Sequence, residues 1–479
     1  MRLIPRNTFA GILCILISLR LALSAIIPLA ETTEARYGEI ARKMLETGNW
    51  INLLDTYNSP FWAKPPLFSW LSASSMALLG ISELSIRLPS MLISIATVIL
   101  IYQFSKNQLN RGKAQLAAIS LMSGFGFLVA SSTVMTDPSL TFSVTLGLCA
   151  WWQHHQKNQP HWAYIFFLAI GLGLLAKGPL ALVLIGMPIF IYLIIQGGWI
   201  QAIKELPWIG GIFIGLVIPS LWYVAAEIRT PGFIEYFVLG EHVYRFIKPG
   251  WTGDLYGFAH TQPKGIIWLY GLIALLPWSL ICVIGLIKCR FKKIIAIKKH
   301  PLRIFLAAWI FSHLIFFSLP ANIIWPYYLP MAPAFAILLS DYLGDNPRLS
   351  KWLIYSCTCV TSLILVAGIY FTITHPGQKI KSGKNVIQVW NKEERGPNSQ
   401  LHYFSTKRIF SLEFYSSGKA NQIKNFEDIT AIIQNDSKDY VVINRDDFNQ
   451  LPTSVKNHFK KLTNGDDSEL HLILLKEVS

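Results

Sequence analysis

A long polar stretch, residues 31–71, carries the residue types that could act on a charged lipid. It contains carboxylates, a guanidinium and an ammonium, among them Glu34, Arg36 and Lys64. Held against a membrane surface, such a set suits an anionic headgroup, because Arg and Lys are the side chains that bind phosphate oxygens in partly desolvated places. The alternative is a solvated helix with ordinary surface ion pairs, which contribute little.

The local sequence predicts how these residues are held. Residues 34–46 contain good helix formers and few breakers, and they predict a helix that stops at Gly48. Pro65 and Pro66 fix the backbone directly after Lys64 and restrict the direction in which this lysine can point.

Charged and aromatic residues also stand at the ends of later apolar runs. Charges at such places cost free energy and are functional candidates by default. Each has an ordinary alternative: a helix cap or first-turn acid for a carboxylate, a snorkelling base for a cation, a hydrogen-bonded structural residue for a lone histidine, and a membrane-interface anchor for a tyrosine. The candidates are Asp137, Lys177, Glu241, His242, Arg245, Tyr327 and Tyr328, with Arg36 and Tyr37 in the first stretch.

The composition indicates a membrane protein. The chain has 479 residues, of which 52% are apolar and only 14% are charged, whereas a soluble domain averages about 25% charged residues. The net charge of +15 would suggest nucleic acid in a soluble chain. Here the basic residues lie mostly between apolar runs, so membrane topology and anionic lipid explain them better, and we expect no nucleic acid.

Several classes of site are absent from the sequence. There is no Walker loop, no dinucleotide-binding glycine fingerprint and no zinc-protease helix signature. This argues against a pump driven by ATP hydrolysis and against a soluble nucleotide-sugar enzyme. The six cysteines have no metal-type spacing, and we expect no structural zinc. No cofactor is expected to be required, and a divalent metal is not indicated.

A membrane span needs about 20 apolar residues, and the sequence predicts about eleven spans. The weakest boundary separates the fifth from the sixth at Lys177, Gly178 and Pro179; were these one span, every later loop would change side. The predicted spans lie near 8–29, 87–105, 113–132, 138–153, 162–176, 178–196, 206–226, 265–287, 302–319, 325–343 and 350–372.

Loop charge predicts the orientation. With the N-terminus in the cytoplasm, the densest basic run, 288–303, lies inside, as do most other basic loops. The outside surface then collects the stretch 31–71, Asp137, Lys177, the loop 227–264 and residues 322–328. Independent solvated ends would not gather on one side so consistently, and we therefore predict a shared site there.

The composition becomes polar after residue 374. Strands are expected at 402–405, 440–444 and 470–476, and helices at 426–434 and near Val455. This predicts a transmembrane domain over 1–374, with a catalytic first outside loop at 31–86, and a soluble α/β domain over 375–479 outside the membrane. The second domain contains no catalytic motif, and a lid or docking role is expected for it.

In their order along the chain, these motifs resemble the bacterial ArnT-like glycosyltransferases, relatives of the protein O-mannosyltransferases within the GT-C superfamily. The similarity covers most of residues 20–345. Each motif alone is weak, but six in order are specific. They are residues 33–42 (TEARYGEIAR) with 44–45 and 48–50, Lys64 to Leu67 with Trp70, residues 87–90, residues 136–138, residues 176–178, and Glu241 and His242 with Arg245 and Phe246. Residues 326–330 also resemble the family's late motif, with Tyr328 at its tyrosine.

The resemblance implies a mainly α polytopic fold of GT-C type and a transferase in the bacterial inner membrane. Its donor would be a sugar on a polyprenyl, undecaprenyl-type phosphate, used on the periplasmic side. Glu34 and Asp137 would serve catalysis. Lys64, Arg245 and Tyr328 would hold the donor phosphate, with Lys177 beside them and Arg36, Tyr37, Glu241 and His242 in support.

The sequence also departs from the family pattern. Thr33 stands where aminoarabinose transferases often have Asp, and Ala63 stands where they often have Glu. The fold and the donor class are compatible with these changes, whereas the sugar and the base are left open. The acceptor is open between lipid A, another glycan and a protein. A flippase or exporter of the same lipid is the first alternative function, and a non-catalytic scaffold is the second.

Overall fold

The computed structural model describes residues 3–157, 159–257, 260–288, 300–377, 380–394, 396, 398–434, 437–466 and 468–478. Most of the predicted basic run 288–303 lies outside these residues. The contacts within the chain divide it into two compact units. Unit 1 comprises Met1–Leu21, Asn49–Leu71 and Arg87–Ile364, and unit 2 comprises Ala22–Gly48, Ser72–Ile86 and Leu365–Ser479.

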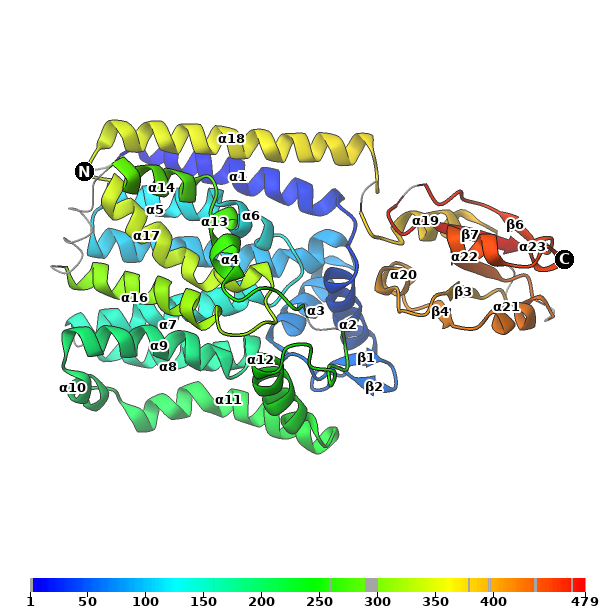
Figure 1. Cartoon of the computed structure of the whole chain (residues 1–479), viewed down its shortest axis with the longest axis horizontal. Coiled ribbons are helices and arrows are strands. Elements are labelled where there is room, and N and C mark those ends of the chain that lie inside the picture. Colours follow the sequence, from blue (N-terminus) through cyan, green and yellow to red (C-terminus); the bar gives the residue numbers. More distant parts are fainter. Residues whose placement is uncertain are drawn as a thin grey trace. The chain divides into compact units, whose positions relative to one another are not determined.

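Unit 1 is a bundle of apolar helices, which Figure 1 shows lying side by side. Four helices, α1, α3, α4 and α18, pass from one unit into the other along the chain. The helices are α1 (Arg6–Ile26), α3 (Leu67–Leu79), α4 (Glu83–Gln108), α5 (Arg111–Ser123), α6 (Phe125–Ala130), α7 (Asp137–Lys157), α8 (Pro160–Lys177), α9 (Leu180–Gln196), α10 (Trp199–Lys204), α11 (Trp208–Arg229), α12 (Arg245–Ile247), α13 (Ile266–Ala274), α14 (Trp278–Lys288), α16 (Pro301–Phe316), α17 (Ala332–Leu343) and α18 (Pro347–Thr374).

Further elements belong to the described part of unit 1. A π-helix, η1 (Glu235–Tyr244), precedes α12, and a 3₁₀-helix, η3 (Trp325–Met331), precedes α17. A short hairpin, β1 (Leu54–Thr56) and β2 (Ser59–Pro60), precedes Lys64.

Each of the eleven predicted apolar segments is helical, although some are broken. The third is interrupted at Gly124, between α5 and α6, and the tenth begins as the 3₁₀-helix η3. The eighth consists of α13 and α14, which meet at a bend of 107°. By length and composition, five helices of the described chain could cross a membrane, or six if the bent pair counts as one span. The number eleven therefore stays a prediction.

Glycines let α8 and α11 approach closely. A methyl group on Gly171 would collide with the backbone of Gly215, and one on Gly211 would collide with the ring of Phe167. Small residues at such places are typical of helix packing in membranes, where no hydrophobic effect drives helices together. The boundary between α8 and α9 is a true break, because Gly178 has a φ of +71°. Two separate helices were predicted there, and this is confirmed.

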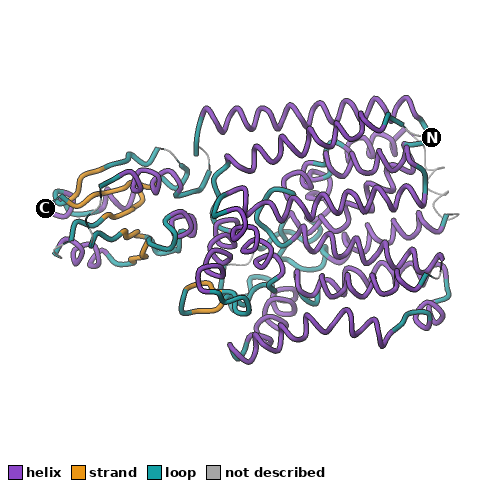
Figure 2. Tube along the Cα trace, turned by 180° about the vertical axis from the view of Figure 1, so that it is seen from behind, coloured by secondary structure: helices purple, strands orange, loops and turns teal. Residues whose placement is uncertain are grey.

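Unit 2 contains a mixed five-stranded sheet in the order β4-β3-β5-β7-β6, with β3 parallel to β4 and β5 and with β7 antiparallel to β5 and β6. Figure 2 shows the strands with helices beside them. The elements are α19 (Lys384–Lys392), β3 (Leu401–Phe404), α20 (Phe410–Tyr415), β4 (Ala420–Ile423), α21 (Phe426–Ile433), β5 (Tyr440–Asn444), α22 (Arg445–Gln450), α23 (Thr453–Lys456), β6 (Phe459–Lys461) and β7 (Leu472–Glu477). We call this set, α19 to β7, the sheet domain.

The sheet is buried on both faces because its strands alternate between two apolar cores. Tyr440 and Val442 of β5 pack with Trp390 of α19, whereas Val441 and Ile443 pack with Ile429 and other residues on the opposite face. Burial of both faces explains the continuous apolar runs of the central strands. The strands predicted at 402–405, 440–444 and 470–476 and the helix predicted at 426–434 are confirmed. The sequence analysis missed β4 and β6, which are short and partly exposed edge strands.

Unit 2 also contains helix α2 (Thr33–Thr47), which packs on α20 of the sheet domain. The helix predicted over 34–46 is thus confirmed. It ends at Gly48, which has a left-handed φ of +66°, a conformation that glycine adopts without steric cost.

Candidate functional site

Unit 1 contains a cavity of about 160 Å³. Three basic side chains from distant parts of the chain, Lys64, Lys177 and Arg245, meet at its wall. Glu241 and His242 line it as well. The rest of the wall is largely apolar and comprises Pro179, Leu180, Val183, Phe246, Phe316, Phe317 and Pro320, together with Asn322 and Tyr327. The cavity wall therefore combines cationic and polar side chains with apolar ones.

Glu241 lies at the centre of the polar residues of the cavity wall. Its carboxylate accepts from Lys64 Nζ at 3.1 Å and from Arg245 Nη1 at 3.0 Å. The Tyr236 hydroxyl donates to its other oxygen at 3.2 Å. Only 4% of the Glu241 side chain is exposed. One buried carboxylate therefore holds two cations that are about 180 residues apart in sequence.

These contacts also set the charge states. Burial by itself raises the pKa of Glu241, but Lys64 and Arg245 outweigh burial and bring this pKa below its ordinary value. Glu241 is therefore an anion at neutral pH. For Arg245, burial lowers the pKa, but Glu241 and Asp254 outweigh it and raise the pKa above its ordinary value. Arg245 also lies 3.3 Å from Asp254 Oδ2.

Asp137 does not line the cavity but holds a residue that does. It begins α7, and its Oδ1 accepts from Lys177 Nζ at 2.5 Å. Both side chains are buried. The Lys177 ammonium also lies 4.8 Å from the centre of the Tyr327 ring. Asp137 thus fixes the ammonium of Lys177, the third cation of the site, without lining the cavity itself.

His242 connects the π-helix to the end of α8. Its two ring nitrogens lie 2.8 Å from the carbonyl oxygen of Phe237 and 3.0 Å from that of Lys177. Burial lowers the pKa of His242, while the hydrogen bonds to the two backbone carbonyls act in the opposite direction. This geometry agrees with the structural alternative that the sequence left open for this residue.

The position of Lys64 depends on a loop far along the chain. The Tyr256 hydroxyl donates to Pro60 O at 2.8 Å and accepts from Trp62 N at 3.0 Å. The rings of Phe61 and Tyr256 pack 4.6 Å apart. The turn before Lys64 is therefore fixed to the loop that follows Arg245.

The same loop is tied to the segment before η3. Asn322 Nδ2 donates to Arg245 O at 2.7 Å, and Gln262 N donates to Ala321 O at 2.8 Å. Sequence reasoning did not single out Asp254, Tyr236, Tyr256 or Asn322. None of them belongs to a motif that the sequence singles out, so only the fold distinguishes each from its neighbours.

The structure does not bring Tyr328 to the cavity. Tyr328 was the tyrosine implied by the resemblance, but it is 1% exposed, and its hydroxyl has no hydrogen-bond partner among the described residues. It packs against Gly126, where a methyl group would collide with the Tyr328 hydroxyl. Tyr327 lines the cavity instead. In the 3₁₀-helix, neighbouring residues point in different directions, and the sequence did not show which of the two faces the site.

The remaining predicted residues, Glu34, Arg36 and Tyr37, lie on α2 in unit 2. Glu34 is buried in the first turn of α2. Its Oε2 accepts from Ala30 N, which precedes the helix, at 3.3 Å. The Arg36 guanidinium lies 4.9 Å from the centre of the Phe410 ring. That Glu34 and Asp137 reach one cavity stays a prediction.

The described residues include no group of three or more His, Cys, Asp or Glu side chains arranged to hold a metal ion. The expectation of a reaction without a metal or another cofactor stays a prediction.

The chain is similar to several known proteins. Residues 63–223 match the family model described as dolichyl-phosphate-mannose-protein mannosyltransferase. An undecaprenyl phosphate-alpha-4-amino-4-deoxy-L-arabinose arabinosyl transferase from Pseudomonas fluorescens is 28% identical over 66% of this chain and 56% of its own length. One from Yersinia enterocolitica is 28% identical over 69% of this chain and 59% of its own length. The chain therefore spans less than two thirds of these relatives.

A solved structure is similar over nearly the whole chain. ArnT from Cupriavidus metallidurans, bound to undecaprenyl phosphate, matches with a TM-score of 0.77 and 16% identity, covering 99% of both chains. Together the comparisons confirm the predicted resemblance to ArnT-like glycosyltransferases. They also confirm a mainly helical, multi-pass membrane fold with a small C-terminal sheet domain.

Proposed function

We propose that this chain transfers a sugar from a polyprenyl phosphate carrier of the undecaprenyl type to an acceptor on the periplasmic side of the inner membrane. The observation that carries the proposal is the convergence of Lys64, Lys177 and Arg245 on one cavity with an apolar wall. A lipid phosphate is complementary to such a cavity, because it combines an anionic headgroup with an apolar chain. The relatives are named for undecaprenyl phosphate-linked aminoarabinose, which favours a pentosyl donor. For the acceptor we propose lipid A, with another glycan or a protein as the alternatives.

The cations would act on the leaving group. Breaking the sugar–phosphate bond transfers negative charge to the carrier phosphate, and fixed cations in a partly desolvated place stabilise that charge as it develops. Lys64 and Arg245 are held ready by Glu241 and would share the phosphate once the donor binds. Lys177 would add a third charge from the side of Tyr327.

The carboxylates would act on the sugar and its acceptor. Glu34 and Asp137 would orient the acceptor and stabilise the oxocarbenium-like centre, and one of them would take a proton if the acceptor is a hydroxyl. A phosphate acceptor would need no base. Attack from the face opposite the leaving lipid would invert the anomeric centre.

The most specific rival is a flippase or exporter that moves the same lipid without transferring the sugar. Deleting the gene and comparing envelope glycolipids by mass spectrometry separates the two. Transfer predicts that one modified product, such as lipid A bearing a pentosamine, disappears. The carrier that still bears its sugar then accumulates on the periplasmic side. Accumulation on the cytoplasmic side would favour the exporter.

We expect the two neighbouring tyrosines to differ in effect. Tyr327→Phe removes a hydroxyl from a cavity-lining residue and should raise the KM for donor about tenfold, as expected for losing a hydrogen bond to a charged group. Tyr328→Phe is the matched control. It removes a buried hydroxyl that lacks a partner among the described residues, and should leave KM unchanged with an equal or slightly higher melting temperature. The opposite pattern in steady-state kinetics would restore Tyr328 as the phosphate-binding residue.

The proposed orientation places the N-terminus in the cytoplasm and the sheet domain outside. A reporter enzyme that is active only outside the membrane should therefore work when fused after residue 374. It should fail when inserted between α4 and α5, near residue 109. The reverse pattern would refute this orientation.

A further inference from the structure

Helix α2 lies directly on α20 of the sheet domain. At the contact stands Gly38, where an added methyl group would be 3.3 Å from the Phe414 ring and 3.0 Å from Ile86. The absence of a side chain at this position allows the close approach. A close contact of this kind transmits small displacements, because packed surfaces compress little.

The chain leading into α2 is tied to the same domain. Leu29 N donates to the Tyr415 hydroxyl at 2.8 Å, and Glu31 N donates to Lys381 O at 2.7 Å. The Glu31 carboxylate accepts from the backbone N–H of Ser411. These contacts join segments that are far apart in sequence, by 380 positions for Glu31 and Ser411, and they fix the segment directly before Glu34.

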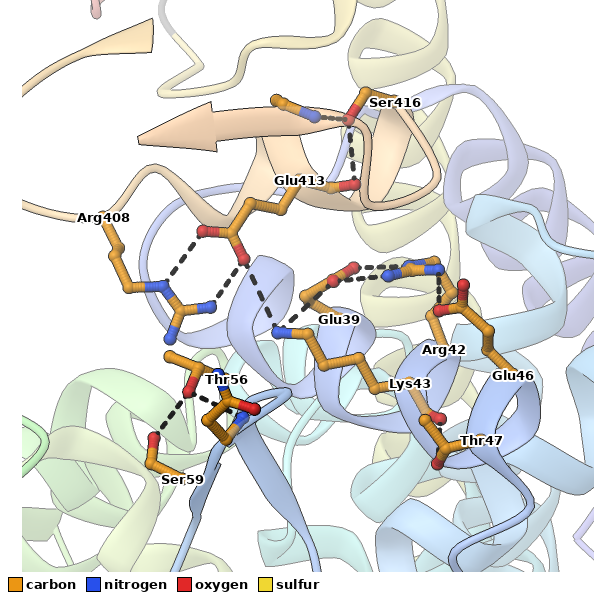
Figure 3. A network of polar contacts seen from close by, with 12 residues as sticks. Glu39, Arg42, Lys43, Glu46, Thr47, Thr56, Ser59, Arg408, Glu413 and Ser416 are labelled. Atoms are coloured by element: carbon orange, nitrogen blue, oxygen red, sulfur yellow. Dashed lines mark hydrogen bonds and ion pairs between the residues drawn. The ribbon is translucent and has the colours of Figure 1, made fainter. Parts of the chain in front are cut away.

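A chain of alternating charges fixes the middle of α2 (Figure 3). Glu413 of α20 pairs with Arg408 of the sheet domain and lies 3.6 Å from Lys43 Nζ. Lys43 lies 3.4 Å from Glu39, and Glu39 binds Arg42 through two hydrogen bonds of 2.7 Å. Arg42 also pairs with Glu46 at 2.8 Å. Lys43, Glu39 and Arg42 are at most 3% exposed.

The alternating signs of these charges favour the observed register of α2. Burial by itself raises the pKa of Glu413, but Arg408 and Lys43 outweigh burial and lower this pKa. Glu413 is thus an anion at neutral pH. A slide or rotation of α2 would separate Lys43 from Glu413 and so cost the attraction between two opposite buried charges. Lys43 would then keep its pair with Glu39, and Glu413 would keep its pair with Arg408.

We propose that the sheet domain positions α2, and with it the carboxylate of Glu34, through the contact between Lys43 and Glu413. Lys43 and Glu413 are then positioning residues of the transfer reaction, and neither lines the cavity. The proposal rests on the proposed function in one respect, the role of Glu34. It gives the sheet domain a task other than docking or covering the site.

Lys43→Met is the sharpest test. Methionine replaces a buried side chain of similar length and removes the bridge, while Glu39 keeps Arg42 and Glu413 keeps Arg408. We expect hydrogen exchange of residues 33–47 to become at least tenfold faster in the full-length protein. We expect kcat to fall about tenfold, with an unchanged KM for the donor and an unchanged melting temperature. Lys476→Met is the matched control, because it removes an ion pair with Glu393 inside the sheet domain. It should change neither exchange in α2 nor kcat.

A second variant, Glu413→Gln, removes the bridge from the other side and should reproduce both effects. Unchanged exchange in α2 in both variants would overturn the inference. Faster exchange with normal kcat would also overturn it, and would separate α2 from the reaction. If the parent protein transfers no sugar, the proposed function fails, but hydrogen exchange still decides whether Lys43 and Glu413 hold α2. Faster exchange would then support the mechanical part of the inference.

Discussion

Alanine at Lys64 or at Arg245 is expected to lower kcat/KM for the polyprenyl-phosphate sugar by about 30- to 1000-fold, which corresponds to about 2–4 kcal/mol of transition-state stabilisation. Each substitution removes a charge-assisted contact to a partly buried phosphate. Each also leaves Glu241 with one cation instead of two. The site is then less positive, and it attracts an anionic ligand less strongly.

The control for this prediction is Lys248→Ala. Lys248 belongs to the same loop and is exposed, with its ammonium 4.7 Å from the centre of the Tyr244 ring and no place in the cavity lining. Its loss should change kcat/KM by less than threefold. The double variant at Lys64 and Arg245 should cost less than the sum of the two single variants, since both contact Glu241. Normal kinetics for both single variants would leave them as ordinary interfacial bases.

Asparagine at Asp137 and glutamine at Glu34 are each expected to reduce kcat by about 10²-fold or more, while the protein still folds and binds donor. For Asp137 the reason is twofold. The substitution removes a carboxylate that we propose acts on the sugar or its acceptor, and it leaves Lys177 without the partner at 2.5 Å that directs its ammonium. For Glu34 the reason is the lost carboxylate alone.

Two further variants separate catalysis from charge balance at Asp137. The double variant Asp137→Asn with Lys177→Met has no unpaired buried cation and should recover stability but not activity. Asp341→Asn removes another buried carboxylate of unit 1, one that pairs with Lys113 and Arg303, and should lower the melting temperature without a comparable loss of kcat. Recovery of activity in the double variant would reduce Asp137 to a counter-ion. Near-normal turnover of Glu34→Gln would leave Glu34 as a first-turn acid of α2.

Local sequence signals predicted the helical elements that carry the site. The left-handed glycine after α2, the Asp137–Pro138 start of α7 and the break at Gly178 each depend on backbone preferences of one or two residues. Such preferences act independently of the fold, so they can be recognised in a single sequence.

Contacts between distant segments could not be predicted in the same way. Glu241 was expected only to support the site, yet it is the residue that joins Lys64 to Arg245. The loop around it is a π-helix, whose wide turns have no clear sequence pattern, and so 227–264 was predicted only as a long loop. The contact of α2 with α20 depends on packing between residues about 380 positions apart, which no local pattern records.

The most direct test of the proposed transfer uses the purified full-length protein, undecaprenyl-phosphate aminoarabinose with a radiolabelled sugar, and three acceptors: lipid A, a different glycolipid and an acceptor peptide. The account predicts that the label moves to one acceptor, with lipid A favoured, and that an equal amount of undecaprenyl phosphate is released. Arg245→Ala should reduce this transfer in proportion to its kcat/KM. Label that remains on the carrier with every acceptor, while the same protein moves the carrier across liposome membranes, would contradict the account.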